Sequence, residues 1–153
     1  MSVYDLLKNV YGKNNEEQLI KSISAVKETL KDLDEDRMCK VYSNFLSNEL
    51  SNNHVPSRII NTLDLDAGYE HHFILVPTNT EGYFLADMTF SQFSPKQEEL
   101  TCLLEKGYQL IDDEGFNKYL NVVTGNNIIG DFSVDDVFYS SPKQEKTTSV
   151  HKR

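Results

Sequence analysis

The stretch that most constrains the fold runs from Glu70 to Phe90 and reads E-H-H-F-I-L-V-P-T-N-T-E-G-Y-F-L-A-D-M-T-F. Two apolar runs flank a short polar segment, a pattern typical of two antiparallel strands joined by a turn. His71 and His72 open the first strand, and Asp87 lies near the end of the second. A hairpin of this kind brings an imidazole and a carboxylate together at one end of a sheet.

Helical periodicity surrounds this hairpin. Apolar residues recur at steps of three and four in several segments. Asp34 or Asp36 is expected to cap the helix over 38–50. Short connections favour antiparallel neighbours among the strands. The expected class is therefore α+β, a small antiparallel sheet with flanking helices. The expected elements are helices over 16–33, 38–50, 95–106 and 113–124, strands over 55–65, 69–76, 83–90 and 108–111, and either a strand or a helical turn within 131–139.

The length of 153 residues fits one domain with a core of its own. We expect a single catalytic domain over 1–140. The segment 141–153, S-P-K-Q-E-K-T-T-S-V-H-K-R, is polar and is expected to be a disordered tail.

Charge and composition limit the classes of partner. The 24 acidic and 15 basic residues give a net charge of −9, which disfavours binding to nucleic acid or to an anionic membrane. No apolar run reaches the length of a membrane span, and the N-terminal residues do not follow the pattern of a signal peptide. The expected protein is a soluble monomer, either cytoplasmic or secreted into a host cell by a route that needs no signal peptide.

The two cysteines differ in their expected settings. Cys102 falls inside an amphipathic helix and is expected in or near the core, whereas Cys39 falls in the first turn of a helix, at the edge of its apolar face. The positive end of a helix lowers a thiol pKa, into roughly the 3.5 to 7.5 range in reactive cysteines. Cys39 is therefore a candidate nucleophile.

A nucleophilic cysteine needs a base, and the base needs a group that orients it. Asp87 is the candidate orienting acid, and either His71 or His72 is the candidate base. Neighbouring residues on a strand point to opposite faces, so only one histidine can be the base, and periodicity alone does not choose between them. No pair of residues has the tight spacing of a zinc site and no glycine motif cradles a phosphate, so we expect neither metal nor cofactor.

The segment from Arg37 to Phe93 resembles the Cys-His-Asp core of papain-like and transglutaminase-like enzymes. Its motif D-x-T-x-x-Q-F, read at Asp87, Thr89, Gln92 and Phe93, is similar to the variant found in bacterial toxin and effector domains, several of which are protein glutamine deamidases.

This resemblance implies a papain-like fold, with Cys39 as nucleophile, Asp87 as orienting acid and Gln92 as a candidate oxyanion or substrate contact. The family spacing from histidine to aspartate favours His72 as the base, with His71 as the alternative.

The leading hypothesis is a thiol hydrolase that deamidates glutamine in a partner protein, such as a host protein, through a thioester. Proteolysis and transglutamination or other acyl transfer share the steps up to that thioester and remain alternatives. A third alternative is a noncatalytic binding module that retains the fold.

Overall fold

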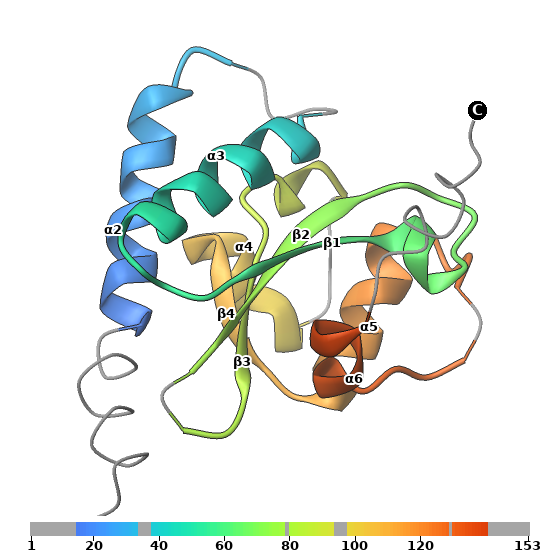
Figure 1. Cartoon of the computed structure of the whole chain (residues 1–153). Helices are drawn as coiled ribbons and strands as arrows, with labels where there is room; N and C mark the ends of the chain where they lie inside the picture. Colours follow the sequence, from blue (N-terminus) through green and yellow to red (C-terminus); the bar gives the residue numbers. More distant parts are fainter. Residues whose placement is uncertain (1–14, 34–37, 79, 94–97, 129, 141–153) are drawn as a thin grey trace, which may run out of the picture.

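The structure, a computed structural model, describes residues 15–33, 38–78, 80–93, 98–128 and 130–140. The first residues of the helix expected over 95–106 and the tail over 141–153 lie outside these residues. Helices and strands are mixed along the described chain, which confirms the α+β class (Figure 1). The helices are α2 (Asn15–Thr29), α3 (Cys39–Asn52), α4 (Thr101–Lys106), α5 (Asp113–Val123) and α6 (Val134–Tyr139), and the strands are β1 (Arg58–Asn61), β2 (His72–Pro77), β3 (Tyr83–Ala86) and β4 (Tyr108–Ile111).

The four strands form one antiparallel sheet in the order β1-β2-β3-β4, so each strand pairs with its neighbour in sequence. Strand β2 is buried along nearly its whole length. Its alternate residues enter two separate cores, because successive side chains on a strand point to opposite faces. Phe73 and Leu75 pack on the face that α5 and α6 cover, whereas Ile74 and Val76 pack against α2 and α3.

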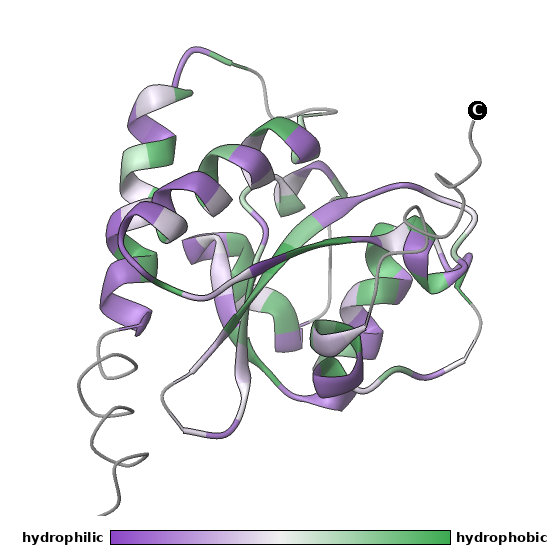
Figure 2. Ribbon diagram, in the orientation of Figure 1, coloured by the Kyte–Doolittle hydropathy of each residue, from purple (hydrophilic) through white to green (hydrophobic). Residues whose placement is uncertain are grey.

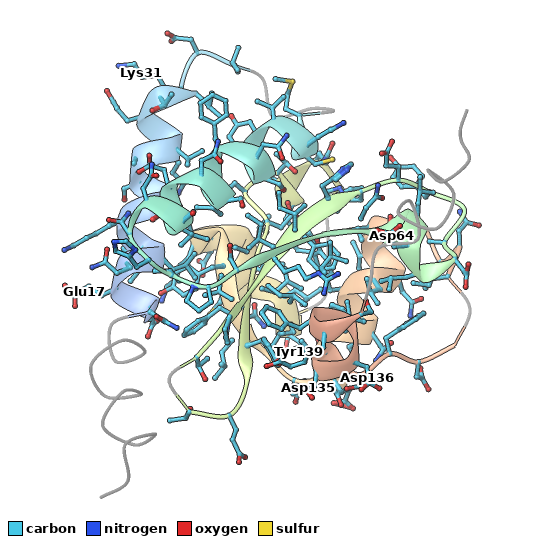
Figure 3. The ribbon with its side chains drawn as sticks, in the orientation of Figure 1. Glu17, Lys31, Asp64, Asp135, Asp136 and Tyr139 are labelled. Carbon is cyan, nitrogen blue, oxygen red and sulfur yellow. The ribbon has the colours of Figure 1, made fainter. Side chains whose placement is uncertain are left out.

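The helices are amphipathic, as their periodicity predicts. Figure 2 shows alternating hydrophobic and hydrophilic bands along α2 and α3. The buried residues of α2 include Leu19, Ile23 and Val26. Glu17 on α2 and Lys31 just after the helix end point away from the body of the molecule in Figure 3, in ion pairs with Lys21 and Glu28. Such exposed pairs contribute little to stability, so apolar burial holds α2 in place.

Several local predictions are corrected. The N-cap of α3 is Met38, without a side-chain hydrogen bond, instead of Asp34 or Asp36. Cys102 is exposed and not in the core, because the short helix α4 buries Leu103 and turns Cys102 outward. The segment predicted as a strand over 55–65 is a strand only to Asn61, whose side chain accepts a hydrogen bond from Leu63 N–H and starts a 3-10 turn.

The segment left open between a strand and a helical turn is helix α6, which lies against the sheet. Arg58 Nη1 donates a hydrogen bond of 2.6 Å to the Phe138 carbonyl, and the Tyr83 hydroxyl donates one of 2.6 Å to Asp135. Asp135, Asp136 and Tyr139 are labelled on this helix in Figure 3. Both hydrogen bonds tie α6 to strands β1 and β3.

Helix α4 ends at Lys106, the expected bound, and its C-cap Gly107 has the left-handed conformation with φ of 84°. We expect Gly107→Ala to lower the free energy of unfolding by about 1 kcal/mol, because an L side chain disfavours this conformation. The nearest atom to an added Cβ is 3.7 Å away, so backbone strain and not a clash is the cause. Urea denaturation measures the loss, and Gly68→Ala is the control, since an added methyl there meets nothing within 4 Å. Equal stability of the two variants would contradict the expectation.

Candidate active site

Cys39 is the first residue of α3 and is partly exposed. The N–H groups of the first helical turn have no acceptor within the helix, and the helix dipole is positive at this end. Helix α3 packs on the sheet over β2, which holds the sulfur above the end of the sheet where β2 begins. This placement agrees with the expected position of Cys39 at a helix start.

The register of the hairpin decides which histidine meets Asp87. Ile74 lies opposite Ala86, so the even-numbered residues of β2 and β3 share one face of the sheet and the odd-numbered residues share the other. His71 and Asp87, just beyond the strand ends, therefore lie on the α5 face, and His72 lies on the α3 face. The Nε2–H of His71 donates a hydrogen bond of 2.8 Å to Asp87 Oδ2.

The predicted pairing of His72 with Asp87 is therefore wrong. His72 and Asp87 are 15 residues apart, so they could share a face only if even-numbered residues of one strand lay opposite odd-numbered residues of the other. His71, the alternative base, is the histidine that the carboxylate holds, and the side chains of His71 and Asp87 are only 1% and 2% exposed.

Further hydrogen bonds satisfy the buried Asp87 carboxylate. Oδ2 also accepts from the Tyr119 hydroxyl at 2.7 Å, and Oδ1 accepts from both the N–H and the hydroxyl of Thr89 at 3.1 Å. The D-x-T motif thus has a physical basis, because the residue two positions after the aspartate folds back on its side chain. This local turn also ends β3 at Ala86, four residues earlier than predicted. Gln92 Nε2 in turn donates to Thr89 Oγ1 at 3.1 Å.

The ring and the backbone of His71 are both fixed. Phe93 contacts the imidazole edge-on, with ring centroids 4.8 Å apart. The buried Thr62 accepts from His71 N–H through its hydroxyl and donates its own N–H to the His71 carbonyl, each at 2.9 Å. With Nε2 committed to Asp87, Nδ1 is the nitrogen left to face the thiol.

The surroundings of Cys39 favour the thiolate. Partial burial raises the thiol pKa, but hydrogen bonds from the side chains of His71 and His72, one from the His72 backbone, and the charge of His71 outweigh it. The pKa of Cys39 falls from 9.0 to about 6. The sulfur lies 3.7 Å from Nδ1 of His72. At neutral pH, Cys39 is therefore largely ionised.

His71 carries the matching positive charge. Burial by itself lowers its pKa, but hydrogen bonds to Asp87 and Cys39 and their negative charges raise the pKa from 6.5 to about 9. Burial and the adjacent Asp87 carboxylate raise the pKa of Tyr119 well above 10.0, so its hydroxyl stays a donor. A thiolate and imidazolium pair is thus the main form between about pH 6 and about pH 9.

His72 has a different set of partners. Its Nε2 lies 3.7 Å from Glu70 Oε2, and the same oxygen is 3.4 Å from Nδ2 of Asn61, the residue opposite His72 on β1. The side chain of His72 is 10% exposed and that of Glu70 is 56% exposed. The sulfur therefore lies between an imidazole backed by Asp87 and a second, slightly more exposed imidazole beside Glu70.

Cys39 and both histidines border one open pocket of about 570 Å³. It is lined by Cys39, Lys40, Tyr69, Glu70, His71, His72, Gln92 and Phe93. A larger pocket of about 690 Å³ lies near the hairpin turn, at the other end of the sheet, and is lined by several acidic side chains. Neither cysteine nor histidine lines that pocket, so the chemistry belongs to the smaller one.

Tyr119 is the site residue that the sequence reading missed. Its position on the buried stripe of α5 is typical of a core aromatic, and it does pack against Phe73 and Phe90. The one available signal is that a buried tyrosine hydroxyl usually needs a hydrogen-bond partner. Nothing in the periodicity of the helix identifies Asp87 as that partner.

Comparison of the chain with protein-family models, curated proteins and solved structures finds no match. Among the described residues, no group of three or more His, Cys, Asp or Glu is placed to hold a metal ion. In the same part of the chain, the helices are too short or too polar to cross a membrane.

Proposed function

We propose that this chain is a papain-like thiol hydrolase that deamidates a glutamine side chain of a partner protein. One observation carries the proposal. The Cys39 thiol, at the start of a helix, lies against two imidazoles, and one of these is fixed by a buried carboxylate. Nucleophile, base and orienting acid are the three parts that thiol-dependent acyl transfer requires.

In the first half of the reaction, the Cys39 thiolate attacks the amide carbon and forms a tetrahedral intermediate. When the C–N bond breaks, its electron pair goes to the nitrogen, and the imidazolium of His71 supplies the proton that completes ammonia. Asp87 accepts the His71 Nε2–H throughout and keeps Nδ1 directed at the reacting atoms. Water then converts the thioester to glutamate and releases the thiol.

The developing oxyanion needs donors close to the sulfur. The backbone N–H groups at the start of α3, those of Cys39 and Lys40, are the first candidates, because they have no acceptor within the helix. Gln92 lines the same pocket, and its Nε2 donates to Thr89 Oγ1. In this proposal the helix N–H groups stabilise the oxyanion and Gln92 supports the wall of the site.

The choice of a protein substrate rests on the open pocket and on the resemblance of the D-x-T-x-x-Q-F segment to effector deamidases. Deamidation of a side chain needs access to the end of one glutamine, which an open pocket provides. An effector acting on a host protein is the biological setting that this resemblance supports.

The test is to incubate the chain and Cys39→Ala with glutamine-containing proteins in water enriched in ¹⁸O, followed by tandem mass spectrometry of the substrates. We expect glutamine to become ¹⁸O-labelled glutamate with the wild-type chain only. New peptide termini would instead assign a protease, and incorporation of an added primary amine without glutamate would assign a transglutaminase. Each of these results would overturn deamidation while retaining the thioester.

A further inference from the structure

We propose that His72 and Glu70 form a second acid–base pair that activates the water for hydrolysis of the thioester. This inference rests on the proposed function, because it assigns the second half of the same reaction. In it, His71 serves the formation of the acyl-enzyme and His72 serves its breakdown.

The two histidines differ in their access to water. His71 is buried behind Phe93, and its Nε2 is bonded to Asp87. Both rings border the open pocket, but the His72 side chain is 10% exposed against 1% for His71, and it lies beside the exposed Glu70 carboxylate. A water molecule that attacks the thioester must come from this pocket, so it meets the imidazole of His72 on its way.

The distances also fit a base for water. His72 Nδ1 lies 3.7 Å from the sulfur, and the carbonyl carbon of an acyl-enzyme is bonded directly to that sulfur. A water hydrogen-bonded to Nδ1 is therefore adjacent to the carbon it attacks. In the free enzyme Nδ1 is the nitrogen that faces the thiolate, but the sulfur of the acyl-enzyme carries no charge to bind an N–H. Nε2 faces Glu70, and in the acyl-enzyme an Nε2–H directed at this carboxylate leaves Nδ1 to accept a proton from water. Asn61, on the neighbouring strand, reaches the same Glu70 oxygen and restrains it.

In the hydrolysis of the thioester, each proton and electron pair has a destination. The water oxygen bonds to the thioester carbon while one water proton passes to His72 Nδ1. The C–S bond then breaks, and its electron pair returns to Cys39 as the thiolate. The carboxylic acid released gives its proton to His71, which lost one to ammonia, and His72 returns its proton to solvent through the pocket.

The test follows an acetyl group on Cys39. p-Nitrophenyl acetate acetylates the folded chain, the excess reagent is removed, and mass spectrometry measures decay of the acetyl adduct. We expect His72→Asn to slow this decay by about 100-fold, because general-base catalysis contributes roughly 10²- to 10⁴-fold. Hydroxylamine attacks without a base, so it is expected to cleave the adduct equally fast in the wild-type chain and in His72→Asn.

Glu70→Gln is a second variant, at a side chain that is 56% exposed. We expect it to slow decay about tenfold, because the amide orients Nε2–H less strongly than a carboxylate. Decay within twofold of the wild-type rate in both variants would overturn the role of His72. Failure of the wild-type chain to form any adduct on Cys39 would instead overturn the proposed function, so the two failures are distinguishable.

Discussion

At pH 6, Cys39 is expected to react with the aromatic disulfide dithiobis(nitrobenzoate) faster in the wild-type chain than in His71→Ala, by up to about 20-fold. The wild-type thiol, with a pKa of about 6, is half ionised at this pH. Without the His71 imidazolium, the thiol pKa returns toward 9.0, and far less thiolate is present. A full return to 9.0 would reduce the ionised fraction of the thiol about 500-fold. Because a more basic thiolate is a stronger nucleophile, with a Brønsted slope of roughly 0.4 to 0.5, the rate then falls by about 20-fold, which is the upper limit because the hydrogen bonds from His72 remain.

This difference is expected to disappear at high pH. At pH 10 both thiols are ionised and His71, with a pKa of about 9, has lost its positive charge, so the two thiolates are expected to react at similar rates. Because Cys102 is exposed and also reacts, both proteins carry Cys102→Ser. Liberated thionitrobenzoate, read by absorbance, reports the rate at each pH. Two parallel profiles that both rise near pH 9 would show that Cys39 is an ordinary thiol, as in a noncatalytic binding module.

Asp87→Asn is expected to slow acetylation of Cys39 by p-nitrophenyl acetate at pH 7 by about 10²- to 10⁴-fold. The carboxylate accepts hydrogen bonds from His71 and Tyr119 on one oxygen, and an amide cannot accept on both of its atoms. The negative charge that raises the pKa of His71 to about 9 is also lost. The imidazolium is then no longer maintained at neutral pH, and the thiol pKa rises with it.

Tyr119→Phe is the matched control for Asp87→Asn. It removes one donor from the same carboxylate oxygen and keeps the charge, so we expect acetylation to slow by no more than about tenfold. Nuclear magnetic resonance of the imidazole protons measures the His71 pKa in all three proteins, and urea denaturation confirms that each is folded. Wild-type acetylation and an unchanged His71 pKa in Asp87→Asn would contradict the assignment of Asp87 as the orienting acid.

The pH profile of the wild-type reaction follows from the same two groups. Below about pH 6 the thiolate of Cys39 is protonated, and above about pH 9 the imidazolium of His71 loses its proton. Hydrolysis of an amide, which needs both forms at once, is expected to plateau between these limits. Reaction with the aromatic disulfide needs only the thiolate and does not fall above pH 9.

Much of the fold was predictable because it depends on local patterns. Steps of three and four between apolar residues identify α2, α3 and α5, and the Asp112 side chain caps α5 at the expected start of that helix. Helix α4 ends at Lys106, where the expected bounds of 95–106 place it. The errors lie where side chains form local hydrogen bonds that compete with extended backbone, at Asn61 after β1 and at Asp87 after β3.

The sequence by itself determined which residue types meet at the end of the sheet: a cysteine at a helix start, two histidines at the beginning of one strand and an aspartate after the next. The choice between the histidines belongs to the tertiary structure. It depends on the register of β2 against β3. One residue more or less in the turn would place His72 on the face of Asp87 in place of His71. The turn closes with a hydrogen bond of 3.0 Å from Thr78 N–H to the Gly82 carbonyl, which sets Ile74 opposite Ala86 and His71 on the face of Asp87. The partnership of Tyr119 with Asp87 arises in the same way, because only packing of α5 on that face brings the two side chains together.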